Sequence, residues 1–272
     1  MEERMKTVVR NLLNVVALVV LTAMPVVAGA ETVGFPSLDK RFHGQLTATL
    51  YVPSGTGPFP AMVLLHTCAG IQAYVGGWAQ WFADQGYEAI VVDSFGPRGI
   101  TSVCGVGGYP DESVRAADAY GALAYLRTRP EVDGNRIGII GWSHGGGAAL
   151  AADDKGEADA LAAGNGFRAD VALYPVCEYM PRHTLAAPLL VLLGANDDWT
   201  GAAPCDRGVK GLAGAGQPAS DYVYPGATHS FDNPADRGVT HVHSHYYTLN
   251  YNADAATDAR TRVAAFLTSA MK

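Results

Sequence analysis

Ser143 lies in the pentapeptide Gly141-Trp142-Ser143-His144-Gly145, which fits the pattern G-x-S-x-G. A short apolar run, Ile137–Ile140, precedes the pentapeptide, and an Ala-rich segment follows it. A serine between two glycines, at a sharp turn from a buried strand into a helix, is typical of a nucleophile elbow. The pattern is loose in a chain with 32 glycines. Its position between a strand and a helix nevertheless favours a nucleophilic serine over a small residue at a tight turn.

A nucleophilic serine needs a base within hydrogen-bond reach, and the base needs a third group to orient it. On open parallel sheets these groups lie in loops after strands, in the chain order serine, acid, histidine. Asp197 and Asp198 follow the apolar run 189–193, and His229 follows the apolar segment 221–224. The sequence therefore predicts a triad of Ser143, Asp197 and His229. Asp198 is the alternative acid, because one of the two aspartates is expected to cap a helix that begins near residue 202.

An acyl-transfer site also needs N–H donors for the oxyanion that develops on the reacting carbonyl. One donor normally comes from the residue after the nucleophile, here His144, and the other from the loop after the third strand. That loop has the sequence His66-Thr67-Cys68-Ala69-Gly70. We assign the second donor to the backbone N–H of Cys68. His144 is therefore expected to act through its backbone rather than through its ring.

Three further histidines, His241, His243 and His245, alternate along the chain and could hold a metal ion. No carboxylate stands beside them at the spacing of a metal ligand, so a solvated loop or an edge strand is favoured. We expect no metal and no organic cofactor.

The elements that must position these residues alternate between apolar strands and amphipathic helices. The segment 46–53 alternates apolar and polar residues and is expected to be an antiparallel edge strand. Other runs are apolar throughout, as in strands buried on both faces of a parallel sheet. This order predicts an α/β fold with a mostly parallel sheet, helices on both faces, and one domain over residues 31–272. The expected elements are strands 61–65, 89–92, 136–142, 169–174, 188–193 and 221–224, a helix that contains residues 78–82 and ends near residue 86, and helices near 112–129 and 255–267.

Residues 1–30 have the character of a secretory signal peptide. Arg4, Lys6 and Arg10 precede an apolar stretch, and Ala28-Gly29-Ala30 fits an A-x-A cleavage site. An uncleaved membrane anchor is the alternative, but Asn11, Asn14 and Pro25 interrupt the apolar run. We expect a periplasmic or secreted protein that does not associate with a membrane after cleavage. Its formal net charge of −7 argues against a nucleic-acid partner.

Four cysteines are present: Cys68, Cys104, Cys177 and Cys205. In an oxidising compartment an even number favours two disulfides over four free thiols. Three connectivities are open. We favour Cys68–Cys104 and Cys177–Cys205, because each pair would link neighbouring loops at one end of the sheet.

Several of these segments together resemble the dienelactone hydrolase family of α/β-hydrolases over the whole chain after residue 30. The resemblance implies the triad Ser143, Asp197 and His229 and the oxyanion donors Cys68 and His144. It also implies that Arg98 reads a substrate carboxylate. The alternative is a structural role for Arg98, in a salt bridge or in a contact to a loop carbonyl. Founding members use cysteine where this chain has Ser143, and a glutamate about where Thr67 stands. The motifs are Leu65-His66-Thr67-Cys68-Ala69-Gly70, Asp93-Ser94-Phe95-Gly96-Pro97-Arg98-Gly99, Gly141-Trp142-Ser143-His144-Gly145-Gly146, Gly194-Ala195-Asn196-Asp197-Asp198-Trp199 and Gly226-Ala227-Thr228-His229-Ser230-Phe231.

The sequence as a whole predicts a serine hydrolase that cleaves carboxylic ester or lactone bonds of small molecules through an acyl-enzyme. Trp142 and Trp199 are expected to line the substrate pocket, beside the glycine-rich loop 95–110. Two alternatives remain: a binding or accessory protein that kept the fold without the chemistry, and a small peptidase.

Overall fold

The computed structural model describes residues 29–162, 165–181, 184–242 and 244–272. The predicted signal peptide, residues 1–30, lies outside this range except for Gly29 and Ala30, and so does His243 of the alternating histidines. In the described ranges, no helix combines the length and the apolar character that crossing a bilayer requires.

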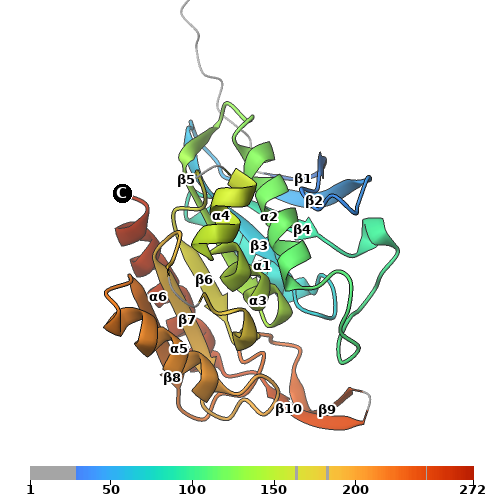
Figure 1. The fold of residues 1–272 in the computed structure, drawn as a ribbon, viewed down its shortest axis with the longest axis vertical. Helices are drawn as coiled ribbons and strands as arrows, with labels where there is room; N and C mark the ends of the chain where they lie inside the picture. The colour runs from blue at the N-terminus through green and yellow to red at the C-terminus, as the bar shows by residue number, and fades with distance from the viewer. Residues whose placement is uncertain (1–28, 163–164, 182–183, 243) are drawn as a thin grey trace, which may run out of the picture.

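One eight-stranded sheet forms the centre of the molecule (Figure 1). Its strand order is β1-β2-β4-β3-β5-β6-β7-β8. The first two strands are antiparallel to each other, β2 is antiparallel to β4, and all other neighbours are parallel. The strands are β1 (Gly29–Pro36), β2 (Gln45–Val52), β3 (Phe59–Leu65), β4 (Glu88–Asp93), β5 (Val132–Trp142), β6 (Asp170–Leu173), β7 (Leu189–Gly194) and β8 (Ala219–Tyr224).

The predicted edge strand at 46–53 is antiparallel, as expected, but it is not at the edge. It is β2, and β1 covers its outer side by pairing along its whole length. Of the side chains of β1, only Phe35 is buried. The strand therefore forms through its backbone hydrogen bonds to β2 and not through an apolar pattern of its own.

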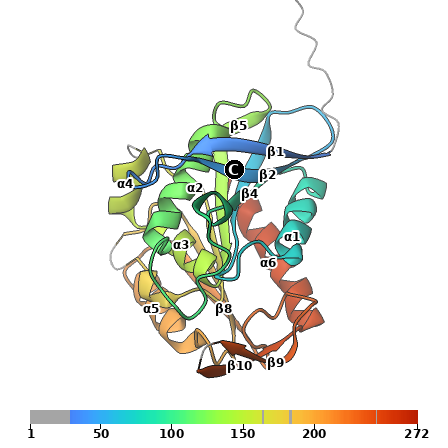
Figure 2. The ribbon, with the colours of Figure 1, turned by 90° about the vertical axis from the view of Figure 1, so that its right-hand side faces the viewer.

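Helices cover both faces of the sheet, which confirms the predicted α/β fold (Figure 2). On one face, α1 (Ala73–Asp84) and α6 (Ala253–Ala270) pack against residues such as Met62 and Leu64 of β3. On the other face, α2 (Glu112–Leu126) and α3 (His144–Ala152) pack against Val63 and Leu65 of the same strand. Alternate side chains of a strand point to opposite faces, so a strand covered on both faces is apolar throughout. The remaining helices are α4 (Lys155–Ala162), α5 (Ala202–Gly214) and two 3₁₀ turns, Gly96–Arg98 and Cys177–Tyr179.

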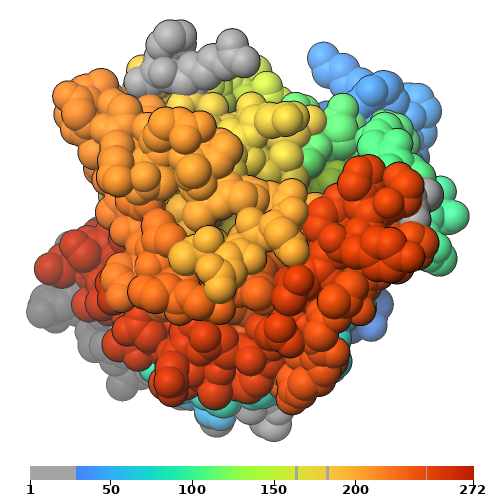
Figure 3. Space-filling model, turned by 90° about the horizontal axis from the view of Figure 1, so that it is seen from below, coloured from blue at the N-terminus to red at the C-terminus, as the bar shows by residue number. Residues whose placement is uncertain are grey.

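The loops after β3, β4, β5, β7 and β8 meet at the carboxyl edge of the parallel strands. A two-stranded hairpin, β9 (Arg237–Val242) and β10 (His245–Asn250), lies at the same end of the molecule (Figure 1). In the view from below, the hairpin, in red-orange, lies beside the glycine-rich loop 95–110, in green (Figure 3). This edge is where the predicted reactive residues are expected to come together.

Gly141 and Gly145 allow the close approach of β5, α3 and β3 at the elbow. A Cβ on Gly141 would overlap the carbonyl oxygen of Gly145, and a Cβ on Gly145 would overlap the carbonyl oxygens of Leu65 and His66. Because these obstacles are backbone atoms, no side-chain rotation could relieve them. The glycines of G-x-S-x-G are therefore required by packing.

The Gly145→Ala substitution is expected to destabilise the protein by about 1–3 kcal/mol, the usual cost of forcing an extra methyl group into a packed interior. Gly211→Ala in α5 is the matched control, since a Cβ there has no neighbour within 4 Å. This control should leave stability unchanged or raise it by about 0.5–1 kcal/mol, because alanine favours a helix. Urea unfolding followed by circular dichroism measures both changes. Equal stability of the two variants would contradict the packing argument.

Candidate active site

Ser143 lies at the turn from β5 into α3 and has backbone angles of φ 55° and ψ −116°. A positive φ is strained for a residue with a Cβ and is found mostly where function requires it. Although Ser143 is the N-cap residue of α3, its hydroxyl does not cap the helix. The Oγ atom instead lies 2.9 Å from Nε2 of His229.

His229 in turn lies against Asp197. Nδ1 of the histidine is 2.8 Å from Oδ2 of Asp197, while Oδ1 accepts hydrogen bonds from the backbone N–H groups of Trp199 and Thr200. Burial by itself would raise the pKa of Asp197, but the hydrogen bonds from His229, Thr200 and Trp199 outweigh it and lower the pKa. Asp197 is therefore held as a carboxylate beside the imidazole.

Asp198, the alternative acid, points elsewhere. Both of its carboxylate oxygens accept from the backbone N–H of Thr248, at 3.1 Å each, in β10. Of the two adjacent aspartates, the geometry thus brings Asp197 to His229 and assigns Asp198 to anchoring the hairpin.

Thr200 contributes a contact that the sequence reasoning missed. Its Oγ1 lies 3.1 Å from Nδ1 of His229 and 3.0 Å from Oδ2 of Asp197, and it also reaches the backbone oxygen of Tyr174 at 3.1 Å. A threonine three residues after an acid carries no sequence signal of its own. Here it fixes the His229–Asp197 pair from one side.

The two predicted oxyanion donors, Cys68 and His144, line one cavity together with Ser143. Among the hydrogen bonds of the described residues, neither backbone N–H has an acceptor. His144 is also the first residue of α3, where the helix dipole gives the N–H groups positive character. Both donors are thus available to a negatively charged oxygen near Ser143.

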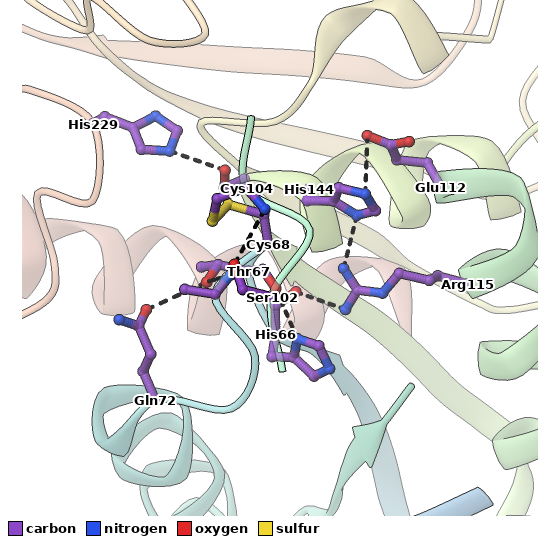
Figure 4. The surroundings of a disulfide bond; sticks show 12 residues. His66, Thr67, Cys68, Gln72, Ser102, Cys104, Glu112, Arg115, His144 and His229 are labelled. Atoms are coloured by element: carbon purple, nitrogen blue, oxygen red, sulfur yellow. Dashed lines mark hydrogen bonds and ion pairs between the residues drawn. A yellow bond between two sulfur atoms is a disulfide. The ribbon is translucent and has the colours of Figure 1, made fainter. Parts of the chain in front are cut away.

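Both predicted disulfides, Cys68–Cys104 and Cys177–Cys205, are present. The first joins the loop after β3 to the glycine-rich loop (Figure 4). The backbone N–H of Val103 also donates to the carbonyl of Cys68 at 2.9 Å. The loop that carries the Cys68 N–H is therefore tied covalently and by a hydrogen bond to the loop across from it.

The ring of His144 lies between Arg115 and Glu112, with Nε2 3.7 Å from Oε1 of Glu112 (Figure 4). Its Nδ1 accepts from Nη1 of Arg115 at 2.9 Å, and Nη2 of Arg115 donates to the carbonyl of His66 at 2.6 Å. Burial and the neighbouring Arg115 lower the pKa of His144 to about 3, so its ring is neutral at pH 7. Burial likewise lowers the pKa of Arg115, to about 10. Arg115 thus connects the two loops that carry the predicted oxyanion donors, a role that its position within a helix did not indicate.

Trp142 is fully buried, so the prediction that it lines the substrate pocket is wrong. Its Nε1 donates to Oδ2 of Asp232 at 3.0 Å. The same carboxylate accepts from Nε1 of Trp78 at 2.8 Å and from the hydroxyl of Tyr174 at 2.6 Å. Because Asp232 follows His229 by three residues, these three donors, which we call the Asp232 anchor, fix the loop that carries His229.

Arg98 makes a structural salt bridge. Its Nη1 and Nη2 atoms each lie 2.8 Å from a carboxylate oxygen of Asp118, and its side chain is 2% exposed. Nη1 also donates to the carbonyl of Ser94. The geometry therefore supports the structural role of Arg98, with both a salt bridge and a loop carbonyl contact, and not the reading of a substrate carboxylate.

Trp199 does line the cavities beside Ser143. Its ring lies 5.1 Å from the His229 ring and stacks on Tyr247 of β10 at 4.5 Å between centroids. His241 and His245 belong to the hairpin and not to this site. Within the described ranges, no group of three or more His, Cys, Asp or Glu side chains is arranged to hold a metal ion.

Two small cavities flank Ser143, of about 240 Å³ and about 190 Å³. The larger lies toward α2 and the glycine-rich loop, and the smaller toward His229 and the hairpin. Cys68, Ser143 and Trp199 contribute to both. A carbonyl placed at Ser143 would thus have room on either side for the two parts of a small molecule.

Comparisons with known proteins show which proteins this chain is similar to. A sequence profile of the dienelactone hydrolase family matches residues 46–271. A putative carboxymethylenebutenolidase from Methylorubrum extorquens is 26% identical over 232 residues, which covers 81% of this chain and 75% of that protein. The carboxymethylenebutenolidase of Pseudomonas putida is 24% identical over 224 residues, or 76% of this chain and 88% of that protein.

Among solved structures, a dienelactone hydrolase-like promiscuous phosphotriesterase from metagenomic libraries is similar in fold. The TM-score is 0.71 at 20% identity, over 90% of this chain and 99% of the other. A thermostable carboxylesterase from a metagenomic library gives a TM-score of 0.65 at 17% identity, over 92% of this chain and 91% of the other.

Proposed function

Because this chain belongs to the dienelactone hydrolase family and is a carboxylic ester hydrolase, we propose that it cleaves ester or lactone bonds through an acyl-enzyme formed on Ser143. The observation that carries the proposal is the continuous set of contacts from Oγ of Ser143 through His229 to Asp197, at 2.9 Å and 2.8 Å. These are the distances that nucleophile, base and orienting acid require.

In the first half of the reaction, Oγ of Ser143 attacks the carbonyl carbon while its proton passes to Nε2 of His229. The N–H groups of Cys68 and His144 stabilise the oxyanion of the tetrahedral intermediate. The carbon–oxygen bond to the leaving alcohol then breaks, and His229 returns the proton to that alcohol oxygen. Asp197 orients the imidazole and stabilises its charged form.

In the second half, His229 takes a proton from a water molecule, and the resulting hydroxide attacks the acyl carbon. The second tetrahedral intermediate collapses, the bond to Oγ breaks, and the proton on Nε2 returns to Ser143. The carboxylic acid leaves. For a lactone, acid and alcohol are parts of one product.

The two disulfides are typical of an oxidising compartment. Together with the A-x-A site at residues 28–30, they support a protein that acts in the periplasm or outside the cell after cleavage behind Ala30.

A fluorophosphonate probe tests the nucleophile directly, because the Oγ atom of an activated serine displaces its fluoride and is phosphonylated. We expect one adduct, on the peptide that contains Ser143, and a parallel loss of p-nitrophenyl butyrate hydrolysis. His229→Ala should slow the labelling strongly, since the base is then missing. Hydrolysis without an adduct on Ser143 would place the nucleophile elsewhere. If the probe forms no adduct and no ester is hydrolysed, the result would favour an accessory protein on the same fold.

A further inference from the structure

The two cavities beside Ser143 have acidic walls. Of the described residues that line them, three carry carboxylates, namely Asp111, Glu112 and Asp236, and none is a lysine or an arginine. Asp111, the N-cap residue of α2, and Glu112, its first residue, lie at the larger cavity, and Asp236 lines the smaller one with His229 and Ser230. A substrate would therefore meet negative charge on both sides of the scissile bond.

The arginines nearest to this site are already engaged. Arg98 is held by Asp118, and Arg115 is fully buried against the carbonyl of His66 and the ring of His144. Arg237 follows Asp236 in the chain, but its Nη1 donates to the carbonyl of Asp236 and its guanidinium lies over the ring of Tyr251. None of these cations is directed at the cavities.

A carboxylate on the substrate would lose hydration on entering such a cavity and would meet no lysine or arginine among its lining residues. Like charges about 7 Å apart, at an effective dielectric constant of about 40, lower binding roughly tenfold for each wall carboxylate. The effect is partly screened by salt, because the cavities open to solvent.

We infer that this site accepts uncharged esters or lactones and rejects those that carry a carboxylate. This inference rests on the proposed chemistry at Ser143 and adds the class of substrate to it. Asp111, Glu112 and Asp236 are the residues that set the preference. It departs from the expectation that Arg98 reads a substrate carboxylate.

The test uses two substrates of the same shape, the mono-p-nitrophenyl ester of adipic acid and its carboxamide, p-nitrophenyl adipamate. At pH 8 and low salt we expect kcat/KM to be at least about tenfold higher for the carboxamide. Raising the salt concentration should narrow the ratio, because screening weakens the repulsion of the acid.

Two variants neutralise one carboxylate in each cavity. Asp111→Asn keeps its cap on α2, since the side chain accepts from Val114 N–H and asparagine caps equally well. Asp236→Asn changes the other cavity. Each variant should lower the ratio of kcat/KM for the carboxamide to kcat/KM for the acid by about three- to tenfold. Asp159→Asn, an exposed position on α4, makes the same change in net charge away from the site and should leave the ratio unchanged.

Equal turnover of acid and carboxamide by the natural protein would overturn the inference, as would variant ratios no different from that of Asp159→Asn. These failures differ from failure of the proposed function. If the Ser143 chemistry is absent, neither substrate is hydrolysed. If only the charge preference is absent, both are hydrolysed, and both activities disappear in Ser143→Ala.

Discussion

Ser143→Ala is expected to lower kcat for p-nitrophenyl butyrate by about 10⁴- to 10⁶-fold, the range seen when a serine nucleophile is removed. The fold should survive, because the Ser143 hydroxyl does not cap α3. Its only partner in the triad is Nε2 of His229. Alanine and serine both carry a Cβ and are equally strained at a φ of 55°, so the substitution should not change the backbone strain.

Steady-state kinetics measure the loss, and circular dichroism with thermal unfolding checks that the variant is folded. A folded variant with near-normal activity would rule out the acyl-enzyme on Ser143. A variant that loses p-nitrophenyl butyrate hydrolysis but keeps the Tm of the natural protein would support the acyl-enzyme on Ser143.

Asp197→Asn is expected to lower kcat by about 10³- to 10⁴-fold, whereas Asp198→Asn should change it less than about threefold. An asparagine at 197 can turn its amide N–H₂ toward Nδ1 of His229, and the imidazole then carries its proton on Nε2. In that tautomer Nε2 cannot accept the proton of Ser143. Asp198 bonds only to the backbone N–H of Thr248 among the described residues.

The Asp197/Asp198 pair makes this a sharp comparison, because the two substitutions remove the same charge at adjacent positions. The measurement is kcat over pH 6–9 for both variants. Equal losses would mean that charge near the site matters more than the tautomer of His229. A larger loss for Asp198→Asn would reassign the triad acid.

Much of the fold was predictable because its strands have simple patterns. Strands β3, β4, β6 and β7, and β5 from Ile137 to Trp142, are buried on both faces and are mostly apolar, and glycine or proline lies near their ends. The strand β1 was not predicted. Gly34 and Pro36 are poor strand formers, and nearly every side chain of β1 is exposed. A strand that exists through pairing with its neighbour leaves no periodic signal in its own sequence.

The site was predictable where chain order and strand ends determine position. Ser143, Asp197 and His229 lie in contact, as their positions after strands predicted, and the disulfides are the favoured pairs. The prediction failed for Trp142, whose place next to the serine suggested a pocket wall. The direction of a strand-end side chain depends on what fills the space behind it, and here that is Asp232.

The partners of buried charged side chains could not be predicted from the sequence either. Arg98 and Asp118 are 20 residues apart, and Arg115 meets a carbonyl 49 residues away. Nothing in the spacing of these residues distinguishes a salt bridge from a binding site. The assignment required the geometry of the 3₁₀ turn Gly96–Arg98 against α2.

The Asp232 anchor has a spectroscopic consequence. Trp78 and Trp142 donate their indole N–H groups to one carboxylate oxygen, and Trp199 lies 5.1 Å from the His229 ring. Three of the four tryptophans of the chain therefore surround the segment from His229 to Asp232. Much of the intrinsic tryptophan fluorescence of the protein therefore comes from side chains in contact with the loop that carries His229 and Asp232. Movement of that loop can be followed in real time without an added dye.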